Sequence, residues 1–401
     1  MFMKRILAAG IAVAAVGTFA TQEAHSQVFT QTLMGGYSCS DAEYGATGAY
    51  FTGNSFGYAS RSEYTSACTV GNTANSAGAV ITATQTLRAA TAQTVGIISN
   101  RVQAVRSALR AEEGLAVSAF SFNDTNGELG LSAGDMSKGV GVWVQGEYTY
   151  VDYDAAAAQF DGYIITGMAG IDKLLLNDRV LVGLSFGYEI GDYETTFNNG
   201  NVEQTGFLVA PYVSFRPNSI ISIDATGGYG TFEIDQDRRD TATNNETFNS
   251  TTDATRYFGS AVINADHAYK KFLFGATAGA SYTIESRDAF TETGNAGNSV
   301  AVGASSTRIG QALFGANVAY DAGKARPFAS VRGEYDFSKS EGITVGTNQS
   351  APEESDFGVR VGLGVNFDIM PGLTGTISGD TVLVREDYTE YSGLGRLRFE
   401  F

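Results

Sequence analysis

The stretch "DFGVRVGLGVNFDI", residues 356–369, alternates between apolar side chains and polar or very small ones. One face carries Phe357, Val359, Val361, Leu363, Val365 and Phe367, and the other carries Gly358, Arg360, Gly362, Gly364, Asn366 and Asp368. A period of two indicates a β-strand whose two faces meet different surroundings. The apolar face is long enough to cross a bilayer as a tilted strand, which needs about 9–11 residues.

The same alternation recurs along the chain, for example in "RVLVGLSFGYEIG" (179–191) and "KFLFGATAGASYTIE" (271–285). Aromatic residues lie near the ends of these apolar faces, where a transmembrane barrel places its interfacial girdles. About twelve such segments follow one another, and they begin near Gly139, Gly162, Arg179, Thr205, Ser219, Arg256, Lys271, Thr307, Ala325, Ser355, Gly372 and Tyr391.

The connections between these segments alternate in length. Short turns follow the even-numbered segments, namely "LLNDR", "RPNS", "AYKK", "DAGK" and "IMPG". Long polar connections are expected after several odd-numbered segments, at residues 234–254, 285–306 and 338–354. Transmembrane barrels have short turns in the periplasm and long loops outside. The N-terminus and the C-terminus of the predicted barrel should therefore both face the periplasm.

We therefore predict an all-β transmembrane barrel of about 12 antiparallel strands over residues 137–401, preceded by one α-helix. The alternative is a soluble β-sandwich, which gives no reason for charge opposite a wide apolar band in strand after strand. The chain has 26 basic and 43 acidic residues, a net charge of −17. This balance argues against nucleic acid or an anionic membrane surface as a partner.

The first 26 residues have the pattern of a secretory signal peptide. Lys4 and Arg5 precede "ILAAGIAVAAVGTFA", an apolar run that is short for a membrane span. Small residues, Ala24 and Ser26, occupy the positions that a signal peptidase recognises, so we expect cleavage before Gln27 and export of the mature chain. The alternative is an N-terminal membrane anchor.

The last segment, "GLGRLRFEF" at residues 393–401, also alternates and ends on an aromatic residue. Chain ends are usually polar and frayed, so an apolar face that runs to the final residue is unusual. That face carries Leu397, Phe399 and Phe401, opposite Arg396, Arg398 and Glu400.

Several of these segments together resemble the translocator β-domain of classical (type V) autotransporters. The matching pieces are "GVGVWVQGEYTY" as first strand, "DGYIITGMAGIDKLL" as second, "GFLVAPYVSF" as fourth and the terminal "RLRFEF". The resemblance covers about two thirds of the chain and implies a twelve-stranded barrel in the outer membrane of a Gram-negative bacterium. It also implies that Leu397, Phe399 and Phe401 are recognised by the barrel-assembly machinery. The glycine often found in that signal would fall at Arg396, whereas this sequence has Gly395.

Residues 76–114 are predicted to form a linker helix. The stretch has no proline, Asn75 or Ser76 can cap its start, and Gly114 suits its end. Apolar residues recur at spacings of three and four, as in a narrow coiled-coil seam: Val95, Ile98, Val102, Val105 and Leu109. Residues 115–136 would connect this helix to the barrel.

Four arginines line the other faces of this helix: Arg88, Arg101, Arg106 and Arg110. The family resemblance implies a helix that passes through the barrel lumen. Acidic residues expected to point inward would attract the arginines there, namely Glu147, Glu189, Asp224 and Glu285. The alternatives are a surface helix and a periplasmic or intermolecular coiled coil, because a narrow seam suits these as well.

Residues 27–75 form a short segment that contains the two cysteines of the chain, Cys39 and Cys68. Because exported chains meet an oxidising compartment, we predict a disulfide between them, worth about 3–4 kcal/mol by loop closure. The alternative is free or intermolecular thiols. Here the sequence departs from the family, because the long β-helical passenger of a secreted autotransporter is not found.

The sequence contains no assembled catalytic or metal-binding motif. "GNSFG" at residues 53–57 fits a nucleophile elbow but lacks the strand–turn–helix context. His267 is the one histidine of the predicted mature chain, and it should lie on the periplasmic side. In "DTNGELGLSAGD", Leu129 occupies the position at which a calcium loop needs glycine. We expect no enzyme, no catalytic residue, no metal and no cofactor.

Two classes of function remain. In the first, the barrel anchors and translocates the short N-terminal segment, which adheres to host or surface ligands by itself or through the long loops. In the second, the barrel is a porin-like channel for small solutes. A helix inside the lumen favours the anchor, and an open lumen favours the channel. The expected partners are outer-membrane lipid and the barrel-assembly machinery.

Overall fold

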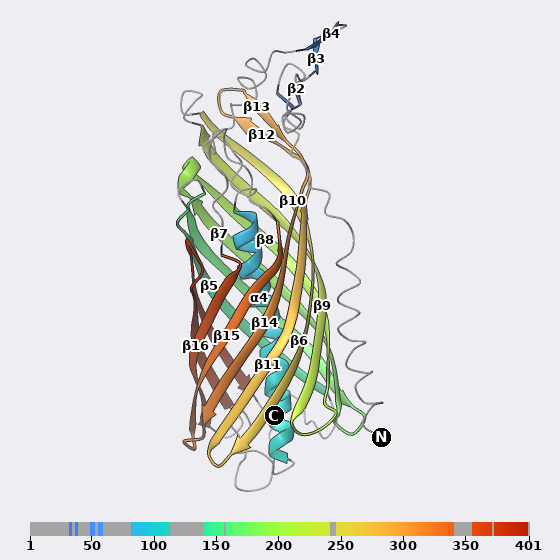
Figure 1. Ribbon diagram of the computed structural model, residues 1–401, viewed down its shortest axis with the longest axis vertical. Coiled ribbons are helices and arrows are strands. Elements are labelled where there is room, and N and C mark those ends of the chain that lie inside the picture. The colour runs from blue at the N-terminus through green and yellow to red at the C-terminus, as the bar shows by residue number, and fades with distance from the viewer. Residues whose placement is uncertain are drawn as a thin grey trace.

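The computed structural model describes residues 32–33, 37–38, 49–52, 55–58, 82–112, 140–155, 158–240, 246–340, 355–370 and 373–399. Twelve antiparallel strands close into a barrel around one helix, α4 (Ala83–Glu112) (Figure 1). The barrel strands are β5 (Val140–Tyr153), β6 (Phe160–Leu175), β7 (Val180–Thr195), β8 (Gly200–Phe215), β9 (Ile221–Asp240), β10 (Glu246–Tyr269), β11 (Phe272–Arg287), β14 (Ser305–Tyr320), β15 (Ala325–Lys339), β16 (Phe357–Met370), β17 (Leu373–Leu383) and β18 (Tyr388–Phe399). The predicted transmembrane barrel with a preceding helix is confirmed.

Six shorter strands and one turn of 3-10 helix complete the described elements. They are β1 (Thr32–Leu33), β2 (Tyr37–Ser38), β3 (Ala49–Thr52), β4 (Ser55–Tyr58), β12 (Phe290–Gly294), β13 (Ser299–Val302) and η4 (Thr196–Asn198). β1 pairs with β2, and β3 pairs with β4, each as a separate two-stranded sheet.

The alternation of the sequence becomes the two faces of the barrel wall. In β16, Arg360 and Asn366 are buried on the inside, whereas Leu363 is 70% exposed on the outside. In β7, Glu189 is buried, and its neighbour Tyr188 is exposed on the opposite face. A closed barrel in a membrane needs this arrangement because its outer face meets lipid and its lumen is polar.

The barrel closes where the last strand pairs with the first. The register across this seam runs from Tyr388 opposite Tyr153 to Gly395 opposite Gly146. Among the described residues it does not extend to residues 140–145 of β5, which pair with β6, or to residues 396–399 of β18, which pair with β17. The seam is therefore shorter than its neighbours, and the unpaired part lies toward the end of the barrel where β5 begins.

Short turns connect the strands at this same end. Leu176, Asn177 and Asp178 between β6 and β7 have φ angles of 55°, 53° and 62°, which is the left-handed conformation that a tight hairpin requires. Between β8 and β9, the Asn218 side chain accepts hydrogen bonds from the backbone N–H groups of Ile220 and Ile221. By the construction rule of transmembrane barrels, this end faces the periplasm.

At the other end, two predicted long loops are partly strand, so those loop predictions were wrong. β9 continues to Asp240 and β10 starts at Glu246, so residues 234–254 are mostly a paired ladder. Residues 285–306 contain the hairpin of β12 and β13, which adds to the edge of β10 above the end of β11 (Figure 1). Beyond the bilayer the outer face of a strand meets water instead of lipid, so that face can be polar and the alternation that marks a strand fades there.

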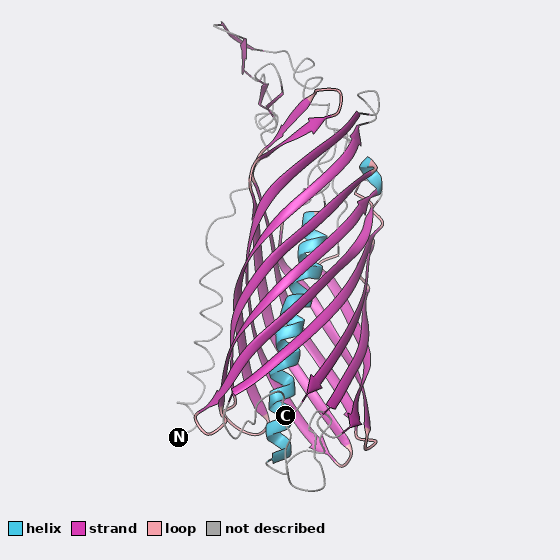
Figure 2. Cartoon of the chain, turned by 180° about the vertical axis from the view of Figure 1, so that it is seen from behind, coloured by secondary structure: helices cyan, strands magenta, loops and turns pink. Residues whose placement is uncertain are grey.

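The helix α4 runs lengthwise inside the barrel (Figure 2). Its first turns lie toward the end that carries β12 and β13, as the colour gradient of the helix shows (Figure 1). Its backbone lies near β5, β6, β9, β11 and β14. The lumen placement agrees with the prediction, and the alternative of a surface helix is wrong. Within the described part of the chain, no helix has both the length and the apolar composition to cross a membrane.

Candidate functional site

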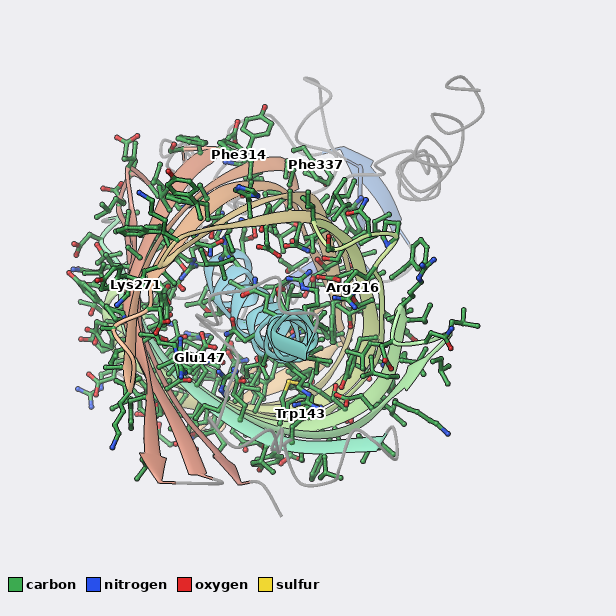
Figure 3. All side chains as sticks on the ribbon, turned by 90° about the horizontal axis from the view of Figure 1, so that it is seen from below. Trp143, Glu147, Arg216, Lys271, Phe314 and Phe337 are labelled. Carbon is green, nitrogen blue, oxygen red and sulfur yellow. The ribbon has the colours of Figure 1, made fainter. Side chains whose placement is uncertain are left out.

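The lumen is the candidate functional site because most of its wall is polar and yet buried. Figure 3, viewed along the barrel, shows α4 within the ring of strands, while Phe314, Phe337 and Lys271 project outside it. The buried wall residues that bear charge, or that bond to such residues, include Asp172, Glu189, Gln204, Ser214, Asp224, Arg256, Asn264, Glu285, Gln311, Glu334, Asp336, Arg360 and Glu390.

An apolar stripe on α4 packs against one side of this wall. Ile98 and Val102 of the helix belong to the same buried cluster as Trp143, Ile164 and Met168 of β5 and β6. The predicted seam residues Val95 and Val105 also contact this cluster. The Leu109 side chain and the Arg110 side chain lie outside the described residues. The apolar stripe that was predicted as a coiled-coil seam thus packs against the barrel wall rather than against a second helix.

Near its first turns, α4 is held by a buried arginine. The Arg88 Nη2 donates to Asp336 Oδ2 of β15 at 3.0 Å, and its guanidinium lies 5.3 Å from the ring centroid of Tyr388. Arg385 donates to the same carboxylate at 2.6 Å. The Arg88 and Asp336 side chains are 1% and 0% exposed, so this pair is fully removed from water.

Uncharged side chains fix the next turns of α4 to opposite parts of the wall. The Gln93 side-chain amide donates to the Glu147 carbonyl at 2.9 Å, and its oxygen accepts from the Thr166 hydroxyl at 2.6 Å. The Thr91 and Thr283 hydroxyls are 3.0 Å apart. The helix is therefore bonded to β5, β6 and β11 at one level of the lumen.

Farther down, Arg101 makes a two-pronged ion pair with Asp172 of β6. Its Nε and Nη2 donate to the two carboxylate oxygens at 2.7 and 2.8 Å. Asp172 also accepts from the Tyr212 hydroxyl at 2.7 Å, and that hydroxyl accepts from Trp143 Nε1 at 2.8 Å. The chain Trp143–Tyr212–Asp172–Arg101 therefore joins three strands to the helix through satisfied buried groups.

The last described arginine contact lies nearest the short-turn end. Arg106 Nη1 donates to Asp224 Oδ2 of β9 at 2.7 Å and also bonds to the Ser222 hydroxyl. Asp224 accepts in addition from Ser214 at 2.6 Å and from Asn264 at 2.8 Å. Three arginines of α4 are thus paired with three aspartates of β15, β6 and β9 along the length of the lumen.

The pairing of the predicted lumen acids differs from the expectation. Among them, Asp224 binds an arginine of α4. Glu189 and Glu285 instead pair with Arg256 of β10, each at 2.9 Å. Arg256 belongs to the wall and lies where the sequence predicts the start of a strand.

Two helix partners, Asp172 and Asp336, were missed by the sequence analysis. Both stand at the polar position of an alternating strand, Asp172 two residues beyond Gly170 and Asp336 two beyond Glu334. Strict application of the period of two would have placed both carboxylates in the lumen.

A cavity of about 260 Å³ remains between α4 and the wall strands β14–β18. It is lined by Gly96, Ser99 and Asn100 of the helix and by polar wall residues that include Arg332 and Asp380. Glu147, whose label in Figure 3 lies beside the helix, also borders it. The helix therefore fills one side of the lumen more completely than the other.

Other predicted sites fall partly or wholly outside the described residues. Cys39, Cys68 and Phe401 lie outside them, and so do the side chains of Leu397 and Phe399. The predicted disulfide and assembly signal therefore stay predictions. His267 is exposed on β10 beside the short turn to β11. The described residues contain no group of three or more His, Cys, Asp or Glu side chains suited to a metal.

A closed twelve-stranded barrel with a helix along its lumen defines a class of outer-membrane protein, the autotransporter translocator. The family model "Autotransporter beta-domain" matches residues 142–380, and the chain belongs to this family. Domains of this family reside in the outer membrane of Gram-negative bacteria, which places this barrel there. No curated protein sequence matches the chain.

Solved translocator domains share the fold. The translocator domain of the autotransporter NalP from Neisseria meningitidis is 16% identical, with a TM-score of 0.57, over 78% of this chain and 98% of that one. The beta domain of the Bordetella autotransporter BrkA is 14% identical, with a TM-score of 0.51, over 66% of this chain and 100% of that one. The P. putida toluene transporter TodX has a TM-score of 0.40 at 9% identity, covering 66% and 90%, and this likeness supports no argument about transport.

Proposed function

We propose that this protein is an anchor that carries its own N-terminal segment through the barrel and presents it at the cell surface. The observation that carries the proposal is the direction of α4. Its first turns lie toward the end with the long strands, and β5 begins at the end with the short turns (Figure 1). The segment before α4 therefore joins the helix at the outward end of the barrel.

The length of the helix supports the same proposal. Thirty residues of α-helix span about 45 Å, which exceeds the roughly 30 Å of hydrocarbon in a bilayer. A chain that enters the lumen at the periplasmic end and follows this helix therefore leaves it outside the membrane. The arginine pairs then hold the helix in place after passage.

The partners that fit this proposal are outer-membrane lipid around the apolar band and the barrel-assembly machinery at the C-terminal strand. Residues 27–75 and the connections at the outward end would contact host or surface ligands, with adhesion as the outcome. Neither a nucleic acid nor a cofactor has a place in it, and no catalytic role is proposed.

An epitope tag beside Asn54 tests the proposal. Antibody should stain intact cells that carry this tag, because the proposed topology places the segment outside. A matched control carries the same tag in the short turn at residues 321–324 and should stain only after the outer membrane is broken. If the tag at Asn54 behaves like the control, the segment is periplasmic and the anchor proposal fails.

A second candidate function, a channel for small solutes, is favoured by one observation. The cavity beside α4 is lined in part by charged and amide side chains, among them Arg332, Asn317 and Asp380. Such a space suits water and small ions. Conduction measurements with and without the helix separate this function from the anchor.

A further inference from the structure

The β12–β13 hairpin is held firmly against the outward extension of β9 and β10. Arg238 of β9 donates to both carboxylate oxygens of Glu292, at 3.0 Å from Nε and 2.7 Å from Nη2. Both side chains are nearly excluded from water, and the guanidinium lies 4.5 Å from the ring centroid of Phe248. A two-pronged buried pair of this kind fixes orientation as well as position.

The tip of this hairpin is fixed as well. The Glu246 side chain accepts from the backbone N–H of Ala296 at 2.8 Å and from the amide of Asn298. The backbone N–H of Asn295 donates to the Thr247 carbonyl at 3.0 Å. The hairpin is therefore a built part of the outward rim.

β13 ends the sheet and presents a free edge. In the sheet order it follows β12, with no described strand beyond it. The N–H of Gly294 donates to the carbonyl of Asn298, and hydrogen-bonded pairs alternate along an antiparallel ladder. The backbone groups of Ser299 and Ala301 consequently point away from β12, toward the open side.

The side chains of this edge leave it open to another strand. Residues 299–302 read Ser-Val-Ala-Val and carry no charge or proline, the features that usually protect an edge from pairing. Val300 and Val302 are only half-buried. A further strand beside β13 would bury both valines and satisfy the open backbone groups.

The β3–β4 hairpin also lacks a neighbouring strand among the described residues. Its register places Phe51 opposite Phe56 and Ala49 opposite Tyr58. Residues 49–58 carry no charge, and the described parts of β3 and β4 pair with no other strand. A lone two-stranded hairpin is marginally stable in water, so it gains stability when a further strand pairs with it.

The connection between the two hairpins permits this contact. α4 begins with its first turns toward the end of the barrel that carries β13 (Figure 1). Residues 59–82 separate Tyr58 from the helix and can span about 80 Å when extended. A tether of this kind makes docking intramolecular, at an effective concentration on the order of millimolar.

We propose that the β3–β4 hairpin adds to the free edge of β13 and extends the rim sheet at the cell surface. The proposal rests on the proposed function, since the hairpin must be outside the cell to reach β13. Docking continues the ladder by backbone hydrogen bonds, and the uncharged composition of residues 49–58 suits a place beside Val300 and Val302.

Hydrogen exchange of the full purified chain gives the first test. If the hairpin is docked, the amides of Ser299 and Ala301 exchange at least about tenfold more slowly than in a chain whose residues 49–58 are replaced by Gly and Ser. The Val300 and Val302 amides, bonded to β12, should remain protected in both chains. Equal and rapid exchange of Ser299 and Ala301 in both chains overturns the proposal.

Proteolysis of intact cells gives the second test. Ala301→Pro removes the outward N–H at an edge position that tolerates proline, whereas Ala301→Val keeps it. Chymotrypsin should cut residues 49–58 about tenfold faster in the Pro variant than in wild type or the Val variant, because cleavage follows the released population. Heat-modifiable mobility confirms that each barrel is assembled.

The two possible failures of this cell experiment look different. Equal cleavage of all three proteins on intact cells leaves the surface segment in place and overturns docking on β13. Cleavage of none of them until the outer membrane is broken overturns the surface location itself, and docking with it.

Discussion

Asp172 shows how single residues hold the lumen together. Its carboxylate accepts from Arg101 Nε, Arg101 Nη2 and the Tyr212 hydroxyl. The carboxylate is removed from water, and these three well-aligned hydrogen bonds offset the cost of its desolvation. Gly183 leaves the space for this arrangement, because a Cβ there would lie 2.1 Å from the Tyr212 ring.

At this scale, Arg101→Ala is expected to lower the free energy of unfolding by about 3–5 kcal/mol, because it leaves the buried Asp172 charge uncompensated. Urea unfolding in lipid vesicles measures the loss. The control is Lys339→Ala, since the Lys339–Asp356 pair is partly exposed (25% and 52%). Its removal should cost less than about 1 kcal/mol. Equal losses in the two variants would mean that Arg101 does not hold the helix.

The sequence could predict which face of each strand is inward but not which charges would meet. Alternation alone gave Asp224, Glu189 and Glu285 the correct face. Whether each one binds α4 or a wall arginine depends on the rotation and depth of the helix and on the strand register. These are set by the packing of Ile98 and Val102 against the wall, which no local pattern encodes.

Among the elements, α4 controls the open area of the lumen. Full-length protein in planar bilayers should conduct weakly, and a chain lacking residues 27–114 should conduct more, because the helix occupies the space that ions would use. A chain lacking residues 27–75 is the control and should conduct as weakly as the intact protein. A large steady current from the intact protein would instead support the channel function.

The C-terminal strand carries a second prediction. Phe401→Asp should reduce assembly into the outer membrane and leave protease-sensitive chain in the periplasm, because the charge interrupts the apolar face of the proposed assembly signal. Phe401→Tyr keeps the aromatic ring and serves as control. Heat-modifiable mobility on gels measures the assembled fraction. Normal amounts of assembled Phe401→Asp protein would show that the final residue is not part of the signal.

The sequence predicted strand boundaries correctly where the strands cross the membrane and wrongly where they extend beyond it. β7, β11 and β15 begin within a residue of their predicted starts, because lipid on one face and lumen on the other enforce a period of two. β10 begins at Glu246, ten residues before the predicted Arg256. Its outward part is a ladder with water on its outer face, so polar residues there resemble a loop.

Across the whole molecule, the apolar band fixes how the barrel lies in the bilayer. Leu363 is 70% exposed at the middle of β16, whereas Leu383 is 47% exposed at the outward end of β17. Leu363→Arg should destabilise the inserted barrel by about 2–4 kcal/mol, and Leu383→Arg by about 0–1 kcal/mol, because the cost of an arginine falls from midplane to interface. Urea unfolding from vesicles compares the two. A larger loss of stability for Leu383→Arg would mean that the membrane surrounds a part of the barrel nearer its outward end.

The short seam between β18 and β5 gives the barrel a built-in direction of failure. When a barrel unfolds, its strands separate first at the interface with the fewest interstrand hydrogen bonds. Here that place lies toward the periplasmic end, where residues 140–145 and 396–399 have no partner across the seam among the described residues. Around the rest of the ring, paired strands and the arginines of α4 resist separation. The two strands would therefore separate first at the periplasmic end of the seam, and pairing at this end would be completed last when the barrel closes.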